Sequence, residues 1–181
     1  LLHEQALEIQ TAIGSRQGQS IVLANLALIP AEQGHPEARP LYERTLILKR
    51  ELGGAKELAR TLGNFGVWYA GQGHLAEARS CYEQAIALIR TTSDRRLLGV
   101  TLGNLAELLG DAGESQAAFN TCEEALAIHR EAENRPFEGV SLSILASLHA
   151  ALGRFDEARS AYQQALLIHR RVLDRRNEAI T

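Results

Sequence analysis

The chain has 181 residues, of which 45% are apolar and 23% charged, with a net charge of −3 and a sequence pI of about 6.1. This balance lacks the concentrated Lys and Arg that nucleic acids and anionic membranes require, so we expect neither as a partner. No apolar run approaches the roughly 20 residues of a membrane-spanning helix. The cysteines, Cys81 and Cys122, are too few for a disulfide framework and favour a reducing, cytoplasmic setting. Methionine is absent and the first residue is Leu1, which indicates a piece of a longer protein.

A segment of the sequence recurs every 40 residues. Copies begin at Arg60, Val100 and Val140, and an earlier copy begins at Ile21, offset by 39 because its turn is one residue shorter. Self-similarity at a fixed period of this size is typical of repeat proteins. We therefore predict one repeat array over residues 1–181. It divides into a half repeat, four full repeats and a stub, at about 1–17, 18–54, 55–94, 95–134, 135–174 and 175–181.

Each repeat is predicted to form two amphipathic helices. Apolar residues recur at helical spacing in both halves, as at Leu142, Leu145 and Ala146. A glycine between the halves, such as Gly73, is typical of a helix end. A polar link follows each pair, as at 174–176. The predicted helices cover 18–33, 36–52, 56–71, 75–91, 95–111, 115–132, 135–151 and 155–172.

Pro30 is the irregular feature of the first full repeat. It lies well inside the first helix, at the position that Tyr69 occupies in the next repeat. Proline removes a backbone hydrogen bond and clashes with the preceding turn, at a cost of about 3 kcal/mol in a straight helix. We therefore expect this helix to kink or to end early between Leu26 and Pro30.

The pattern within the repeats resembles that of the tetratricopeptide repeat family. In the second repeat the matching residues are Leu62, Phe65, Gly66, Tyr69, Gly73, Ala78, Tyr82 and Ala85. The period of 40 in place of 34 is similar to the longer repeats of kinesin light chains and of many bacterial regulatory proteins. The resemblance implies an all-α fold, a right-handed superhelical solenoid of antiparallel helix pairs, in a cytoplasmic, bacterial protein that binds other proteins.

We find no residue set that predicts catalysis, a cofactor or a metal site, and we predict that the chain is not an enzyme. The glycines recur at the repeat period, so turns and packing explain them. His129 and His169 share one position in adjacent repeats, each beside an arginine, and are interpreted as surface histidines near helix ends. Cys122 occupies a core aromatic position and is interpreted as a small buried hydrophobe.

In proteins of this family the first helices line a concave groove, and there we expect a peptide to bind. Helical geometry places Arg60, Asn64 and Val67 opposite the apolar core face of their helix. The predicted peptide-binding residues of the concave groove are Asn25, Arg60, Asn64, Val67, Asn104, Glu107, Ser143 and Ser147.

Three of these groove residues are asparagines at the same position of successive repeats. An Asn amide can pair with both groups of a peptide unit, so a row of them would hold an extended backbone. The alternative is that each Asn bonds to the neighbouring first helix and fixes the rotation between repeats. Only Arg60 is basic here, so the binding of acidic chain ends known from relatives is not expected.

Two functional hypotheses follow from the sequence. The first is an interaction scaffold that binds a peptide or helix in the groove. The second is a regulatory or structural segment of a larger bacterial protein, which packs on its own chain or self-associates without a separate ligand. Apolar residues near both ends, such as Ile9, Leu166 and Leu167, favour end-to-end association.

Overall fold

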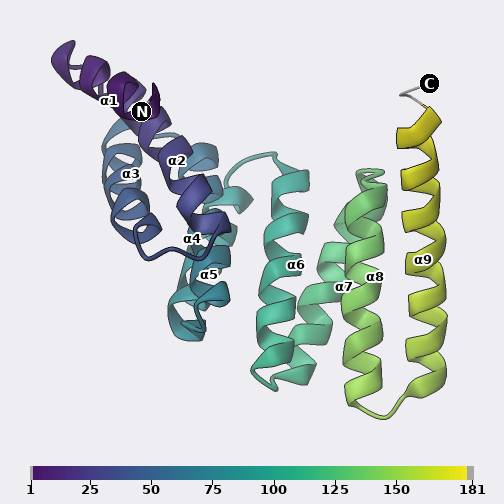
Figure 1. The fold of residues 1–181 in the computed structure, drawn as a ribbon. Coiled ribbons are helices and arrows are strands. Elements are labelled where there is room, and N and C mark those ends of the chain that lie inside the picture. The colour runs from purple at the N-terminus through teal and green to yellow at the C-terminus, as the bar shows by residue number, and fades with distance from the viewer. Residues whose placement is uncertain (1, 179–181) are drawn as a thin grey trace. The chain divides into compact units, whose positions relative to one another are not determined.

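The computed structural model describes residues 2–178, and every regular element in that range is an α-helix (Figure 1). The prediction of an all-α repeat array is confirmed. Each predicted helix limit lies within two residues of the observed one, except at the end of the last helix. The helices are α1 (Leu2–Ala12), α2 (Arg16–Glu32), α3 (Ala38–Leu52), α4 (Ala55–Gly71), α5 (Leu75–Arg90), α6 (Arg95–Asp111), α7 (Ser115–Glu131), α8 (Arg135–Ala151) and α9 (Phe155–Glu178).

The helices form two compact units. Unit 1 contains α1 to α5 and ends at Ser93, and unit 2 begins at Asp94 and contains α6 to α9. Unit 1 is built on the hairpins α2–α3 and α4–α5, and unit 2 on the hairpins α6–α7 and α8–α9. We call α2, α4, α6 and α8 the first helices, and α3, α5, α7 and α9 the second helices. A short turn joins the two helices of each hairpin, so they run antiparallel.

The turn inside each hairpin depends on a glycine in the left-handed conformation. Gly73 has a φ of +77° and Gly113 a φ of +78°, which strain any residue with a Cβ. This conformation lets the next amide turn back, and the His74 N–H donates to the Tyr69 carbonyl at 2.9 Å. A carbonyl at the end of α4 is thereby satisfied. The recurrence of glycine at this position therefore has a backbone cause.

Small side chains lie where the two helices of a hairpin approach each other. Ala78, Ala118 and Ala158 are all buried. Cys122 is also buried, and its thiol donates to the Ser141 carbonyl at 3.3 Å, which links α7 to α8. The interpretation of Cys122 as a small buried hydrophobe is confirmed, and burial raises the pKa of its thiol to about 12.

The early helix end predicted near Pro30 is wrong. Helix α2 continues through Pro30 to Glu32. Proline removes a single N–H from the last turn, while Leu23 and Ala27 bury the same helix against the core of unit 1. The carbonyl of Pro30 accepts from the His35 N–H at 2.7 Å, so the end of the helix is closed in spite of the proline.

The predicted link at residues 174–176 is also wrong. Helix α9 continues through these residues to Glu178, six residues beyond its predicted end at 172. The segment from Arg170 to Arg176 contains neither glycine nor proline, and Arg and Leu are strong helix formers. Local propensity therefore carries the helix across residues that are polar enough to form a link.

Candidate functional site

A cavity of about 510 Å³ lies between α2 and α4, the two first helices of unit 1. We call it cleft 1. Leu28 of α2 and Val67 of α4 line it with exposed side chains, and Val67 keeps 51% of its surface accessible. Trp68 and Tyr42 are buried and also line it, so the inner wall is aromatic. Cleft 1 thus combines apolar walls with a volume that accommodates a large side chain.

The aromatic wall of cleft 1 is held from both sides. Phe65 stacks on Tyr42 with ring centroids 5.0 Å apart and on Trp68 at 5.8 Å. The indole Nε1–H of Trp68 donates to the His35 carbonyl at 3.2 Å, and Gln72 Nε2 donates to the Gly34 carbonyl at 3.1 Å. These two bonds tie the turn after α2 to α4. The cleft is therefore preformed rather than dependent on a ligand to open it.

Three amides, a phenol and a carboxylate are among the polar groups that line cleft 1, and Gln33 and Gln72 supply two of the amides. Asn64 is exposed, and Glu32 is exposed at the end of α2. Burial raises the pKa of Tyr42 to about 12, and the charge of Glu32 acts in the same direction. The phenol therefore stays protonated at neutral pH and can donate a hydrogen bond into the cleft.

A second, smaller cavity occupies the equivalent place in unit 2. It measures about 220 Å³ and lies between α6 and α8, and we call it cleft 2. Glu107 and Asp111 of α6 and Ser147 of α8 line it. The Ser147 hydroxyl bonds to the Tyr162 hydroxyl at 2.8 Å, so its polar wall is already partly satisfied.

The structure distributes the eight predicted peptide-binding residues between the two units. Asn64 and Val67 line cleft 1, and Glu107 and Ser147 line cleft 2. The other four lie outside both clefts: Asn25 is exposed on α2, Arg60 is exposed on α4, Asn104 is half-buried on α6, and Ser143 donates to the Gly139 carbonyl of its own helix.

The three asparagines differ from the serines in their hydrogen bonding. Counting only the side chains that are described, none of Asn25, Asn64 and Asn104 forms a hydrogen bond to a neighbouring helix. This favours the interpretation in which their amides face a ligand over the one in which they fix adjacent helices. By contrast, the bonds of Ser143 and Ser147 to their own helix occupy their hydroxyl donors.

Sequence reasoning missed the aromatic wall of cleft 1. Trp68 and Gln72 follow Asn64 at intervals of four residues, which places all three on one stripe of α4. This stripe contains the lone tryptophan of the chain. That signal was present, but Tyr42 comes from a second helix and enters the cleft only through tertiary packing.

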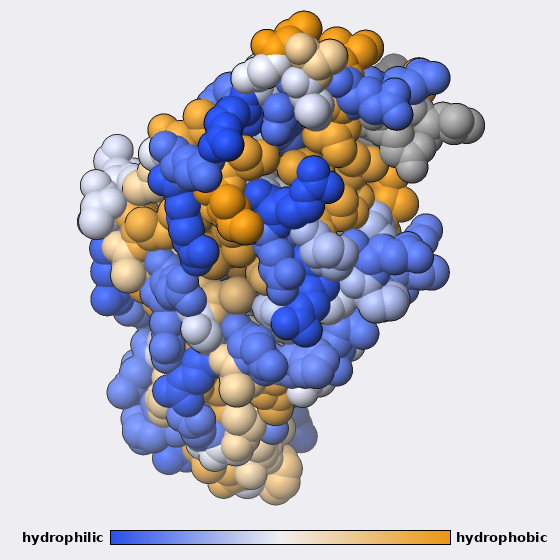
Figure 2. Space-filling view, turned by 90° about the vertical axis from the view of Figure 1, so that its left-hand side faces the viewer, coloured by the Kyte–Doolittle hydropathy of each residue, from blue (hydrophilic) through white to orange (hydrophobic). Residues whose placement is uncertain are grey.

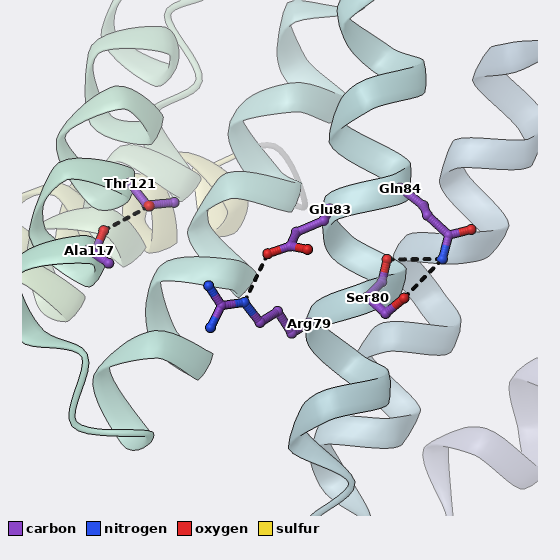
Figure 3. A network of polar contacts seen from close by, with 6 residues as sticks. All are labelled: Arg79, Ser80, Glu83, Gln84, Ala117 and Thr121. Carbon is purple, nitrogen blue, oxygen red and sulfur yellow. Dashed lines mark hydrogen bonds and ion pairs between the residues drawn. The ribbon is translucent and has the colours of Figure 1, made fainter.

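The exposed sides of the second helices satisfy their polar groups locally. Figure 3 shows Arg79 Nε donating to Glu83 at 2.8 Å and Gln84 donating to the Ser80 carbonyl at 3.2 Å, both within α5. In α7, the Thr121 hydroxyl donates to the Ala117 carbonyl at 2.8 Å. An Arg–Glu pair four residues apart stabilises the helix surface.

The interpretation of His129 as a surface histidine is wrong, because its side chain is buried with 1% of its surface exposed. Its ring stacks on Phe137 at 5.5 Å. On the other side it lies against Gly99, where an added Cβ would be 2.6 Å from the ring. Burial lowers the pKa of His129, so the ring is neutral at pH 7. Gly99 and Gly139 stand opposite His129 and His169, and this pairing was the missed signal.

The described residues contain no group of three or more His, Cys, Asp and Glu side chains that would hold a metal ion. None of the helices described here has the length and apolar character needed to cross a membrane.

Stacked antiparallel hairpins of this kind define the chain as a helical repeat protein. The sequence model of the tetratricopeptide repeat family matches residues 31–91 and 97–171. These ranges cover more than half of the chain, so the chain belongs to the tetratricopeptide repeat family, whose members typically bind other proteins. No curated protein sequence matches the chain significantly.

Solved structures share this fold at low sequence identity. Aspartyl phosphate phosphatase F from Bacillus subtilis matches with a TM-score of 0.86 and 14% identity, over 95% of this chain and 45% of its own. BtubC (BKLC) from P. vanneervenii matches with a TM-score of 0.76 and 20% identity, over 93% of this chain and 70% of its own. The TPR-like repeats of a kinesin light chain candidate from Podosopora anserina match with a TM-score of 0.62 and 20% identity, over 95% of this chain and 94% of their own. The chain thus spans less than half of the phosphatase, and the likeness concerns the fold alone.

Proposed function

We propose that the chain is a non-catalytic interaction scaffold that binds a peptide or helix of another protein on its first helices, with cleft 1 as the main contact. The observation that carries this proposal is a preformed apolar cleft beside an unpaired amide. Leu28 and Val67 expose apolar surface at its walls, and Asn64 has no hydrogen bond to a neighbouring helix in the described residues.

Binding in cleft 1 would use two kinds of contact. A bulky side chain of the partner would bury apolar surface against Trp68, Leu28 and Val67, at about 25 cal/mol per Å² removed from water. The Asn64 amide would pair with a backbone N–H and C=O of the partner, which fixes its direction. Asn25 and Asn104 are proposed to do the same elsewhere on the first helices, with Arg60, Glu107, Ser143 and Ser147 as further polar contacts.

The proposal takes the chain to work in the bacterial cytoplasm. Cys81 and Cys122 are both free and buried, and burial raises the pKa of the Cys81 thiol to about 11. Thiols with such high pKa values carry little thiolate and resist oxidation. Their presence suits a reducing compartment without requiring one.

A second candidate function is self-association or packing on another part of the same protein. Ile9 of α1, Ile13 in the turn after it and Ile47 of α3 are exposed, as are Leu166 and Leu167 of α9. Figure 2 shows apolar surface in patches between hydrophilic residues on the face that carries α1 and α3. Exposed apolar surface of this kind favours contact with another protein surface.

Site-specific photo-crosslinking separates the two functions. A benzophenone side chain is placed at Val67 in cleft 1, or at Ala87 on the exposed side of α5 as a matched control. We expect the Val67 variant to crosslink a different polypeptide in the source extract, and the Ala87 variant to crosslink none. Crosslinks from Val67 only to a second copy of the chain would support self-association, and equal crosslinking from both positions would contradict a specific cleft.

A further inference from the structure

The charged residues that line the two clefts are all acidic. Glu32 is the one charged residue that lines cleft 1 among the described residues, and Glu107 and Asp111 line cleft 2. Glu32 and Asp111 occupy the same position in their repeats, two residues before the hairpin glycine. Among the side chains that the structure describes, neither carboxylate has an ion-pair partner.

Three arginines of the first helices form ion pairs with residues that do not line the clefts. Arg60, the one basic residue expected in the groove, pairs with Glu57 of its own helix at 2.5 Å. Arg16 pairs with Glu51, and Arg95 makes the equivalent pair in unit 2. These arginines stand in the first half of their helices, whereas Glu32 stands at the C-terminal end of α2. The helix dipole adds negative potential at that end.

We infer that the partner of cleft 1 is a cationic segment, which places a bulky apolar side chain against Trp68 and a Lys or Arg side chain against Glu32. This inference rests on the proposed function, because it specifies the ligand of the same cleft. The apolar cavity would take up the apolar side chain, and the unpaired carboxylate at its edge would bind the Lys or Arg side chain. An acidic segment would bring a second negative charge to Glu32 with no described cation in the cleft to offset it.

The lone tryptophan makes cleft 1 directly observable. Trp68 lies in the wall of the cleft, so its fluorescence reports occupancy there and nowhere else in the chain. A random dodecapeptide library displayed on phage is selected on the whole chain, and the enriched peptides are synthesised. We expect them to carry Lys or Arg next to a large apolar residue, to shift the Trp68 emission, and to bind more weakly as salt is raised.

Two charge variants test the role of Glu32. Glu32→Gln should weaken binding of the enriched peptides roughly two- to fivefold, since an exposed ion pair contributes about that much. Glu32→Lys should weaken it further and should select acidic peptides from the same library. Glu83→Gln and Glu83→Lys, on the exposed side of α5, are the matched controls and should change neither affinity nor selection.

The outcomes separate the inference from the function beneath it. Peptides that shift the Trp68 emission but are neutral or acidic, with affinities unchanged in Glu32→Gln, would overturn the cationic partner and leave the peptide-binding function standing. If the folded chain enriches no peptide that shifts this emission, both ideas fail. Enrichment that depends equally on Glu32 and Glu83 would show general attraction of cations and would overturn a specific contact.

Discussion

Cleft 1 and cleft 2 lie at the same place in two copies of one architecture, yet they offer different surfaces. In cleft 1 the facing positions on the two first helices hold Leu28 and Val67, and the equivalent positions in cleft 2 hold Glu107 and Ser147. The two clefts also differ in volume, about 510 Å³ against about 220 Å³. The repeat fixes where a cleft forms, and a few positions on the first helices decide what it can bind.

The interiors of the hairpins likewise combine one backbone arrangement with different side chains. In α6–α7 Gly99 lies against the His129 ring, and the residues 40 positions earlier, in α4–α5, are Ala59 and Ile89. All four residues are buried. The larger ring of histidine is matched by the loss of a methyl group on the opposite helix. The same backbone arrangement is therefore kept in both hairpins, because the two side chains of each pair change in size in opposite directions.

The largest expected effect comes from breaking that match. Gly99→Ala would place a Cβ 2.6 Å from the His129 ring, which Phe137 holds from the other side. Overpacking outweighs the gain of a better helix former, so the free energy of unfolding should fall by about 1–2 kcal/mol. Urea denaturation followed by circular dichroism measures the change.

Two further variants sharpen this result. Gly103→Ala lies on the same helix, and its Cβ would meet nothing within 4 Å, so it should raise the stability by up to about 1 kcal/mol. Adding His129→Ile to Gly99→Ala copies the Ala59–Ile89 pair of unit 1 and should recover most of the loss. If Gly99→Ala and Gly103→Ala behave alike, the close contact does not limit packing.

The second prediction compares the asparagines of the two units in partner binding. Replacing both Asn64 and Asn104 by Ala should weaken binding of a peptide partner more than tenfold, because each loss leaves polar groups of the partner unpaired. Asn64→Ala alone should account for most of it, since Asn64 lines the larger cleft. Titration of the single and double variants measures this. Unchanged affinity with a lower melting temperature would show that the asparagines hold the repeats together.

The sequence predicted most of this fold because the fold is local. A 40-residue period, a turn glycine and helical spacing of apolar residues placed the limits of eight helices to within two residues, except for the end of α9. Local helix propensity explains that exception, and two other failures come from tertiary contacts. Pro30 stays helical because Leu23 and Ala27 bury the same helix, and His129 is buried because Gly99 leaves room for its ring.

The candidate site was predicted less completely than the fold. Helical geometry put Asn64 and Val67 on the side of α4 opposite its core face, and both line cleft 1. It could not add Tyr42, which reaches the cleft from α3, or show that Arg60 is neutralised by Glu57. The periodicity of one helix is enough to show which residues share a face, whereas the lining of a cleft depends on how two or three helices pack together.

The third prediction concerns acid and the hairpin interior of unit 2. Burial lowers the pKa of His129 in the folded state below its ordinary value of 6.5, and the charge of Glu138 opposes this shift. As the pH falls through about 6.5, the unfolded chain therefore takes up a proton before the folded chain does. The free energy of unfolding should decrease between pH 7.5 and 5.5, and above that range His129 should contribute no pH dependence.

A variant assigns this pH dependence to one residue. His129→Ile carries the side chain that α5 has at Ile89, and it cannot titrate. Urea denaturation of both proteins at several pH values should give a shallower decrease for the variant. Parallel stability curves for the two proteins would mean that other groups cause the acid effect.

The smallest expected effect on stability concerns a buried carboxylate at a position where another repeat has leucine. Glu138 of α8 is buried, whereas the equivalent position of α6 holds the buried Leu98. Arg130 binds the carboxylate at 3.2 Å and Arg135 at 2.7 Å, and both arginines are more than half exposed. Removing a carboxylate from water is costly, while ion pairs with exposed arginines return little because solvent screens them. Leucine has a similar volume, carries no charge to desolvate, and leaves both arginines in water. Glu138→Leu should therefore raise the free energy of unfolding by between zero and about 1 kcal/mol in urea denaturation.

Glu138→Ala is the control, because it removes the same charge but leaves a gap, and it should destabilise the protein. A loss of more than about 1 kcal/mol in Glu138→Leu would mean that the two arginines fix how α8 packs on α7.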